Sequence, residues 1–221
     1  EVRCVVLTGT GTSFCAGGDV KGMGNRDPDR PRPKGPEAAI ADLTERQKTL
    51  TGALYAMPKP TLASLPGAAA GAGLSIALAC DLRIASESAF MTTGFARIGL
   101  SGDYGASFFL TQMVGTARAR ELFFTGARIP ARQCEEWGLI NRVVPDDELG
   151  AETRALARQL ASGPSLAFAQ MKKNLDHALR ADLSSCLEQE AKGLIRTAGT
   201  QDHKEAVSSF VEKREPHFEG R

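Results

Sequence analysis

The sequence has almost no net charge, no paired cysteines and few histidines. Its 27 basic and 26 acidic residues give a net charge of +1, so no bulk attraction to nucleic acid or to an anionic membrane is predicted. The five cysteines are scattered and include no Cys-x-x-Cys pair, which argues against a disulfide framework and a thiolate zinc site and indicates a reducing, cytoplasmic setting. All three histidines follow residue 176, so no histidine-based metal site or general base is predicted before that point.

Several common catalytic and binding motifs are also missing. No Gly-Lys dipeptide occurs, which excludes a P-loop. Gly9 and Gly11 follow a predicted strand, but Phe14 stands where a dinucleotide-binding fingerprint has its third glycine. The segment 73–77, GLSIA, resembles a nucleophile elbow without its last glycine. A serine hydrolase built on it would need a base from the histidines near the C-terminus, and we do not favour that interpretation.

No apolar run in the sequence is typical of a membrane span. Residues 61–80 carry no charge and are long enough to cross a bilayer. However, Pro66-Gly67 divides them, and the many Gly, Ala and Ser residues lower their hydrophobicity, so we predict a strand, a turn and a short buried helix. With 42% hydrophobic residues over 221 positions, the chain can bury a sizeable core and needs no disulfide or metal to fold.

Strand and helix patterns alternate through the first two thirds of the chain, and only helices follow. Short apolar runs predict strands at 2–8 (buried on both faces), 61–65, 81–85 and 140–144. Apolar residues at helical spacing predict helices at 37–56, 71–79, 117–124, 147–162, 165–179, 182–197 and 201–214. Loops are predicted at 9–21 and 26–36. This order predicts an α/β core over 1–145 and a helical subdomain over 146–221.

Two segments rich in small residues could together bind an oxyanion. CAGGD (15–19) follows a predicted strand, and GAAAGAG (67–73) leads into a predicted helix. Residues without bulky side chains let a ligand approach the backbone, and the first turn of a helix offers unpaired N–H groups at the positive end of its dipole. Two such donors aimed at one point would stabilise an enolate or a tetrahedral oxyanion. Tight packing of small residues explains the same pattern without a ligand.

Four segments together resemble the crotonase (enoyl-CoA hydratase/isomerase) superfamily. They are VVLTGTGTSFCAGGDVKGM (5–23), PKPTLASLPGAAAGAGLSIALACDLRIAS (58–86), ARIGLSGDYGASFFLTQMVGTARARELFFTGARIPARQCEEWGLINRVVP (96–145) and FVEKREPHFEGR (210–221). The likeness covers essentially the whole chain, but the family's first pair of strands has no counterpart, so the chain looks truncated at its start. The resemblance implies an α/β crotonase-like spiral of ββα units with a C-terminal helical trimerisation subdomain.

The resemblance also implies an acyl-CoA thioester as substrate, with no metal and no redox cofactor. The backbone N–H groups of Gly18 and Ala72 fall at the family's two oxyanion-hole positions. The chain is expected to assemble as a homotrimer or a hexamer, in which tail residues reach the CoA of a neighbouring subunit. The positions that match CoA-binding positions of the family are Ala16, Asp19 and Val20 in the core and Phe210 and Lys213 in the tail.

The resemblance leaves the reaction open. A hydratase of this family uses two glutamates, and this chain has Ser75 and Phe95 at the matching positions. Neither side chain can act as an acid or base near neutral pH, so both are predicted only to line the substrate site. Asp103, in a loop between Gly102 and Gly105, matches the catalytic aspartate of several crotonase-type isomerases and of the aryl-CoA dehalogenases.

We therefore predict that Asp103 is the acid/base in double-bond isomerisation of an enoyl-CoA. Burial in an acyl site would raise its pKa and make it a better base, whereas a plain turn aspartate would only bond its own backbone. The alternatives are enoyl-CoA hydratase activity, acyl-CoA thioester hydrolysis with Asp103 activating water or attacking directly, and a non-catalytic acyl-CoA-binding subunit. Dehalogenation is disfavoured because only 6% of the residues are aromatic.

Overall fold

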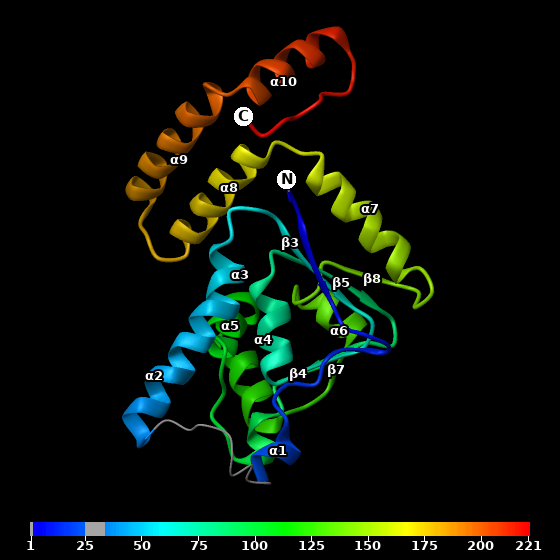
Figure 1. Ribbon diagram of the computed structural model, residues 1–221, viewed down its shortest axis with the longest axis vertical. Coiled ribbons are helices and arrows are strands. Elements are labelled where there is room, and N and C mark those ends of the chain that lie inside the picture. Colours follow the sequence, from blue (N-terminus) through cyan, green and yellow to red (C-terminus); the bar gives the residue numbers. More distant parts are fainter. Residues whose placement is uncertain (1, 25–33) are drawn as a thin grey trace. The chain divides into compact units, whose positions relative to one another are not determined.

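A computed structural model describes residues 2–24 and 34–221 of the chain (Figure 1). Most of the predicted loop at 26–36 therefore lies outside the described residues. Within the described part, no helix combines the length and the apolar character that a bilayer crossing requires. The chain divides into two compact units, one formed by residues 6–56 and 61–153 and the other by residues 1–5, 57–60 and 154–221.

Among the described residues the first unit contains two four-stranded sheets, and the first six strands of the chain alternate between them. The first sheet has the strand order β1 (Val5–Thr8), β3 (Thr61–Leu65), β5 (Leu82–Ser86), β8 (Arg142–Val144). The second has the order β2 (Ser13–Cys15), β4 (Ala68–Ala70), β6 (Phe90–Thr92), β7 (Ile129–Pro130). Pairing is parallel from β3 through β5 to β8 and from β2 through β4 to β6, and antiparallel between β6 and β7.

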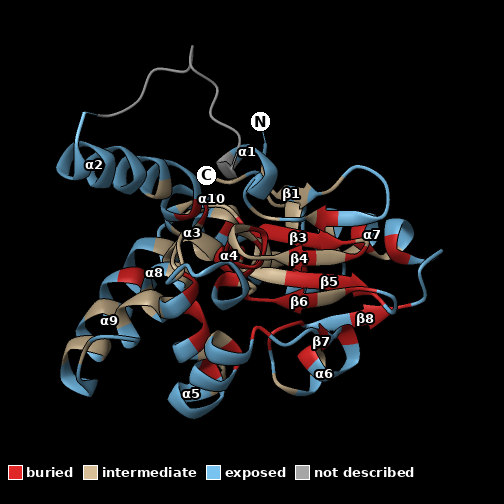
Figure 2. Cartoon of the chain, turned by 90° about the horizontal axis from the view of Figure 1, so that it is seen from below, coloured by how far each residue is buried: buried red, intermediate tan, exposed pale blue. Residues whose placement is uncertain are grey.

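The core of this unit lies around the central strands, which Figure 2 shows as buried. All five residues of β3 are buried, and a fully buried leucine or isoleucine contributes roughly 1.5–3 kcal/mol relative to an exposed one. The predicted full burial of the first strand is wrong. β1 lies at the edge of its sheet and alternates between half-buried and exposed residues, so only one side of it is packed.

The helices of the first unit connect and cover these strands. They are α1 (Val20–Gly24), α2 (Pro36–Gln47), α3 (Ala53–Ala56), α4 (Ala72–Ala79), α5 (Ala106–Thr125) and α6 (Ala131–Glu136). A π-helical turn, Lys48–Gly52, joins α2 to α3, so the predicted helix at 37–56 is continuous, but its predicted apolar face is not buried along its length. Leu54 is 7% exposed, whereas Ile40 is 65% exposed, and no residue of α2 is buried.

A buried arginine holds the C-terminal end of α4. The Arg83 side chain donates from Nη1 to the carbonyl of Cys80 at 2.6 Å and from Nε to the carbonyl of Leu139 at 2.7 Å. Desolvation by burial lowers the pKa of this guanidinium to about 10. Carbonyls at a helix C-terminus carry partial negative charge, so Arg83 stabilises the C-terminal end of α4. The N-terminal end of the same helix belongs to the candidate site.

The second unit is helical, as predicted for the C-terminal part of the chain. Its helices are α7 (Leu149–Ala161, whose first turn belongs to the first unit), α8 (Ser165–Ala178), α9 (Leu183–Ala198) and α10 (Gln201–Glu212). Side-chain caps begin two of them, since Asp182 accepts from the Ser185 amide at 2.9 Å and Thr200 from the His203 amide at 3.1 Å. Such caps satisfy amides that the first helical turn leaves unpaired.

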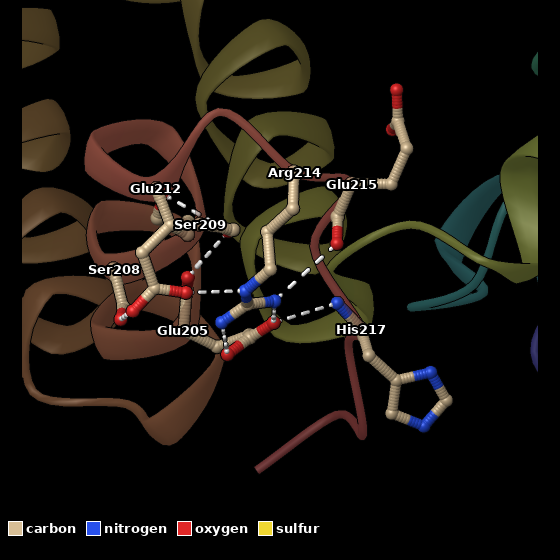
Figure 3. A network of polar contacts seen from close by, with 8 residues as sticks. Glu205, Ser208, Ser209, Glu212, Arg214, Glu215 and His217 are labelled. Atoms are coloured by element: carbon tan, nitrogen blue, oxygen red, sulfur yellow. Dashed lines mark hydrogen bonds and ion pairs between the residues drawn. The ribbon is translucent and has the colours of Figure 1, made fainter.

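The chain after α10 folds back onto that helix through charged contacts (Figure 3). Arg214 bonds Glu205 at 2.6 Å, and the amide of His217 donates to the same carboxylate at 3.0 Å. These contacts, with the Arg214 hydrogen bond the largest, lower the pKa of Glu205 to about 2. The buried carboxylate of Asp202 accepts from the amides of Glu219 and Gly220. The tail motif of the sequence is therefore an ordered part of this unit.

Candidate active site

The two small-residue segments predicted to form an oxyanion hole lie in contact in the structure. The parallel pairing of β2 with β4 directs the chain after Cys15 and the chain after Ala70 to the same end of the second sheet. A Cβ added to Gly73 would lie 2.2 Å from the carbonyl oxygen of Cys15, and one added to Gly17 would lie 2.7 Å from that of Ala70. Such distances exclude a side chain at Gly17 and Gly73. These glycines are therefore required by packing as well as by any ligand.

The predicted donors Gly18 and Ala72 come from these two segments. Ala72 is the first residue of α4, so its N–H has no acceptor within the helix and lies at the positive end of the dipole. Gly71, which precedes it with φ 55°, donates its own N–H to the carbonyl of Thr92 at 3.0 Å. Gly18 follows Gly17, whose Cα lies 4.0 Å from the position a Cβ of Gly71 would occupy. The two amides thus belong to touching turns, as an oxyanion hole requires.

Asp103 lies in the loop between the 3-10 turn Phe95–Ile98 and α5, and it has the features of a base. Its residue is half-buried, and among the described residues its buried Oδ1 atom has no hydrogen-bond partner. Desolvation raises the pKa of this carboxyl above its ordinary value of 3.8. A carboxylate with an unused acceptor oxygen and a raised pKa is suited to take a proton from a substrate.

Ser75 links Asp103 to the proposed oxyanion hole. It lies one helical turn after Ala72, is 0% exposed, and donates from Oγ to the main-chain carbonyl of Asp103 at 3.0 Å. The hydroxyl also lies 3.4 Å from the carbonyl of Gly71. Ser75 was predicted to line the substrate site. In the structure its side chain is buried, and its hydroxyl proton is donated to the carbonyl of Asp103.

Phe95 forms an apolar wall beside both parts of the site. It is 4% exposed, and its Cε1 atom lies 3.7 Å from the position a Cβ of Gly71 would occupy. Its ring stacks on Phe123 with 6.0 Å between centroids, and both rings contact the space beside Gly102. Phe95 thus adjoins the turn before Ala72 and the loop that carries Asp103, and it supplies no acid or base.

The predicted CoA-binding residues are divided between the two units. In the first unit Ala16, Asp19 and Val20 are exposed after β2, and Asp19 also caps α1 by accepting from the Gly22 amide at 3.0 Å. In the second unit Phe210 is 85% exposed near the end of α10, and Lys213 is exposed at its C-terminal cap with φ 55°.

Comparison with known proteins places this arrangement in a family. The family model described as enoyl-CoA hydratase/isomerase matches residues 1–221. The chain belongs to the enoyl-CoA hydratase/isomerase family. It is therefore an acyl-CoA enzyme of the crotonase superfamily, and the predicted superfamily and the predicted α/β crotonase-like fold with a C-terminal helical region are confirmed.

Individual relatives of this family member have different names. It is 40% identical to a probable enoyl-CoA hydratase of Rhodobacter capsulatus and 37% identical to the 1,2-epoxyphenylacetyl-CoA isomerase of Escherichia coli, covering 100% of this chain and 82% of each relative. A crystal structure of an enoyl-CoA hydratase from Polaromonas sp. JS666 superposes with a TM-score of 0.89 at 33% identity, covering 98% of this chain and 82% of that one. The names support hydratase and isomerase chemistry equally, so the residues of the site must decide between them.

Sequence reasoning missed one residue of this crotonase-family site, Gln47 at the end of α2. Its Oε1 atom accepts a hydrogen bond from the amide of Tyr104, next to Asp103, at 2.6 Å. A single glutamine in an exposed, charged helix has no sequence signal that marks such a contact. Within the described residues, no group of three or more His, Cys, Asp or Glu side chains could hold a metal ion.

Proposed function

We propose that this enzyme isomerises the double bond of an enoyl-CoA, with the amides of Gly18 and Ala72 binding the thioester oxygen and Asp103 moving the proton. The observation that carries the proposal is the buried Oδ1 of Asp103, which has no hydrogen-bond partner among the described residues, on a loop tied by Ser75 to the helix that begins at Ala72. One carboxylate and one oxyanion hole are sufficient for a 1,3-proton shift.

In the proposed mechanism the two amides polarise the thioester carbonyl and thereby acidify the carbon next to it. Asp103 removes a proton from that carbon, and the electron pair becomes a dienolate whose negative oxygen is held by the N–H groups of Gly18 and Ala72. The protonated Asp103 then returns the proton to the carbon at the far end of the dienolate. Its raised pKa favours the first transfer, because the carboxylate is a stronger base than an ordinary aspartate.

The same site contains no second carboxylate at either position where a hydratase of this family has a glutamate. Ser75 and Phe95 occupy those positions, and neither can activate water. Hydratase activity, which the name of the Rhodobacter relative suggests, requires Asp103 to activate water alone, and thioester hydrolysis requires Asp103 to activate water or to attack the thioester directly. A non-catalytic subunit would bind acyl-CoA without any proton transfer.

We further propose that the enzyme is a homotrimer or a dimer of trimers that works in the cytoplasm without a metal or a redox cofactor. Large apolar side chains are exposed on the last two helices of the second unit, and a second copy of the chain would cover them. They are Leu183, Leu187, Leu194, Ile195, Phe210 and Val211. Light scattering after gel filtration should give the mass of three or six chains, and a monomer would contradict this assembly.

Deuterium exchange tests the proton-transfer chemistry without knowledge of the natural acyl group. Butyryl-CoA is incubated with the enzyme in D₂O, and deuterium at the carbon next to the carbonyl is measured by mass spectrometry. The parent enzyme should catalyse exchange, and Asp103→Asn should lower its rate by about 10²–10⁴-fold. Asp147→Asn, at an exposed surface position, is the matched control and should exchange normally. Exchange at the parent rate in Asp103→Asn would refute the assignment of the base.

A further inference from the structure

Side chains from two helices hold the peptide group between Asp103 and Tyr104 at both of its ends. Ser75 of α4 donates to the carbonyl oxygen of this peptide group at 3.0 Å. Gln47 of α2 accepts from its N–H at 2.6 Å. The amide of Ala106, at the start of α5, donates to the same carbonyl at 3.1 Å. The two side chains thus contact the carbonyl and the N–H of one peptide plane.

One residue of this peptide group, Tyr104, has an unfavourable backbone conformation. Tyr104 has φ 50°, and Gly102 and Gly105 have φ 116° and 85°. Glycine adopts such angles freely, but a residue with a Cβ does not. Rotation of the Asp103–Tyr104 peptide plane would bring Tyr104 toward negative φ, which its side chain prefers. That rotation would also break the bonds to Ser75 and Gln47, so these bonds stabilise the strained orientation.

The hydrogen bonds of Ser75 and Gln47 to this peptide group, which we call the clamp, also couple the two halves of the proposed site. Ser75 follows Ala72 by one turn of α4, and its Oγ bonds the carbonyl of Asp103 while lying near that of Gly71. The helix that begins at Ala72 is therefore hydrogen-bonded, through Ser75, to the loop that contains Asp103. Ser75 is fully buried, so water cannot easily compete for its hydrogen bond. Gln47 is half-buried.

We propose that Gln47 and Ser75 are positioning residues that fix the Asp103–Tyr104 peptide plane and thereby aim the Asp103 carboxylate at the substrate. This inference rests on the proposed function, in which Asp103 is the base. A displacement of about 1 Å in a reacting group can lower a rate by about 100-fold, so loss of either bond should affect catalysis without removing any group that touches substrate.

The test compares variants that remove one bond with variants that keep it. Gln47→Met has a similar length and no acceptor, whereas Gln47→Glu retains an acceptor oxygen. Ser75→Ala removes the hydroxyl. The controls are Gln133→Met, at an exposed position of α6, and Ser86→Ala, at a buried serine whose Oγ donates to the carbonyl of Leu65 at 3.3 Å. Exchange into butyryl-CoA gives kcat and KM for each variant, and circular dichroism gives its folded fraction.

The expected result is a fall in kcat on the order of 10-fold or more for Gln47→Met and Ser75→Ala, with KM nearly unchanged. Gln47→Glu should recover most of the rate. A loosened loop would hydrate Asp103 and lower its pKa, so the acid limb of the rate profile should move to lower pH in Gln47→Met. A purely structural role would not move this limb. Gln47→Met keeps the proposal testable if Ser75→Ala does not fold.

Three results would count against the inference, and they are distinguishable. If Asp103→Asn loses exchange while Gln47→Met turns over at the parent rate with the parent pH profile, the clamp is wrong and the proposed function stands. If Asp103→Asn exchanges normally, the proposed function fails and the clamp fails with it. A loss of rate in Ser75→Ala no greater than that in Ser86→Ala would also refute positioning by Ser75.

Discussion

Gly73→Ala should damage both stability and catalysis, because this glycine lies directly against β2. A Cβ at this position would lie 2.2 Å from the carbonyl oxygen of Cys15 and 2.8 Å from its Cβ atom. These are backbone and near-backbone atoms, which cannot rotate away as the end of a long side chain can. The helix and the strand would have to separate by more than about 1 Å to reach ordinary van der Waals contact.

The size of the effect follows from that displacement. Overpacking against a rigid neighbour costs about 1–3 kcal/mol, and a clash with backbone belongs at the upper end of that range. For a chain of this length, a loss of about 3 kcal/mol lowers Tm by about 6–12 °C. Because α4 begins at Ala72, the same movement would shift one proposed oxyanion donor relative to Gly18, and about 1 Å of misplacement can cost about 100-fold in rate.

Two assays on matched variants check this expectation. Urea unfolding at fixed protein concentration gives the change in the free energy of unfolding, and deuterium exchange into butyryl-CoA gives the change in rate. Gly193→Ala in α9 is the control, because a Cβ there would have its nearest neighbours at 3.5 Å, and alanine should stabilise a helix interior by about 0.5–1 kcal/mol. If Gly73→Ala unfolds within about 0.5 kcal/mol of the parent and exchanges at the parent rate, the close contact between β2 and α4 is refuted.

Three further changes test other parts of the structure. The rate of exchange should fall as the pH drops through the raised pKa of Asp103, and its acid limb should lie above the ordinary aspartate value; a limb at or below that value in a pH–rate profile would contradict the burial of the carboxyl. Asp103→Asn should slightly raise Tm at neutral pH, because a folded-state pKa above the unfolded value means that the charged form destabilises the fold at higher pH; a lower Tm in calorimetry would contradict this sign. Arg83→Met should lower the free energy of unfolding by about 3 kcal/mol or more in urea titration, because it leaves the buried carbonyls of Cys80 and Leu139 without this donor. An unchanged free energy of unfolding would refute the role of Arg83 as a helix cap.

The elements that the sequence predicted well are those stabilised by their own residues. The four C-terminal helices were predicted from apolar spacing and Gly or Pro breaks, and they occur within a few residues of the expected bounds. Thr61–Leu65 was likewise predicted, because a short apolar run between Pro and Gly is typical of a buried strand. The strands that sequence reasoning missed, β2, β4, β6 and β7, have only two or three residues each. So short a segment is a strand only because distant segments pair with it.

The sequence by itself determined the family and the four C-terminal helices, and it suggested Gly18, Ala72 and Asp103 as candidate site residues, because these depend on local pattern and on motif order. Only the tertiary structure decided how these residues are used. It buried Ser75 beneath the loop of Asp103, and it brought Gln47, 57 positions away, to the amide of Tyr104. Hydrogen bonds between residues distant in sequence depend on how the chain folds back on itself. The Oδ1 of Asp103, which lacks a hydrogen-bond partner in the part of the chain that the structure describes, and the clamp on its peptide group therefore have no signature in the sequence.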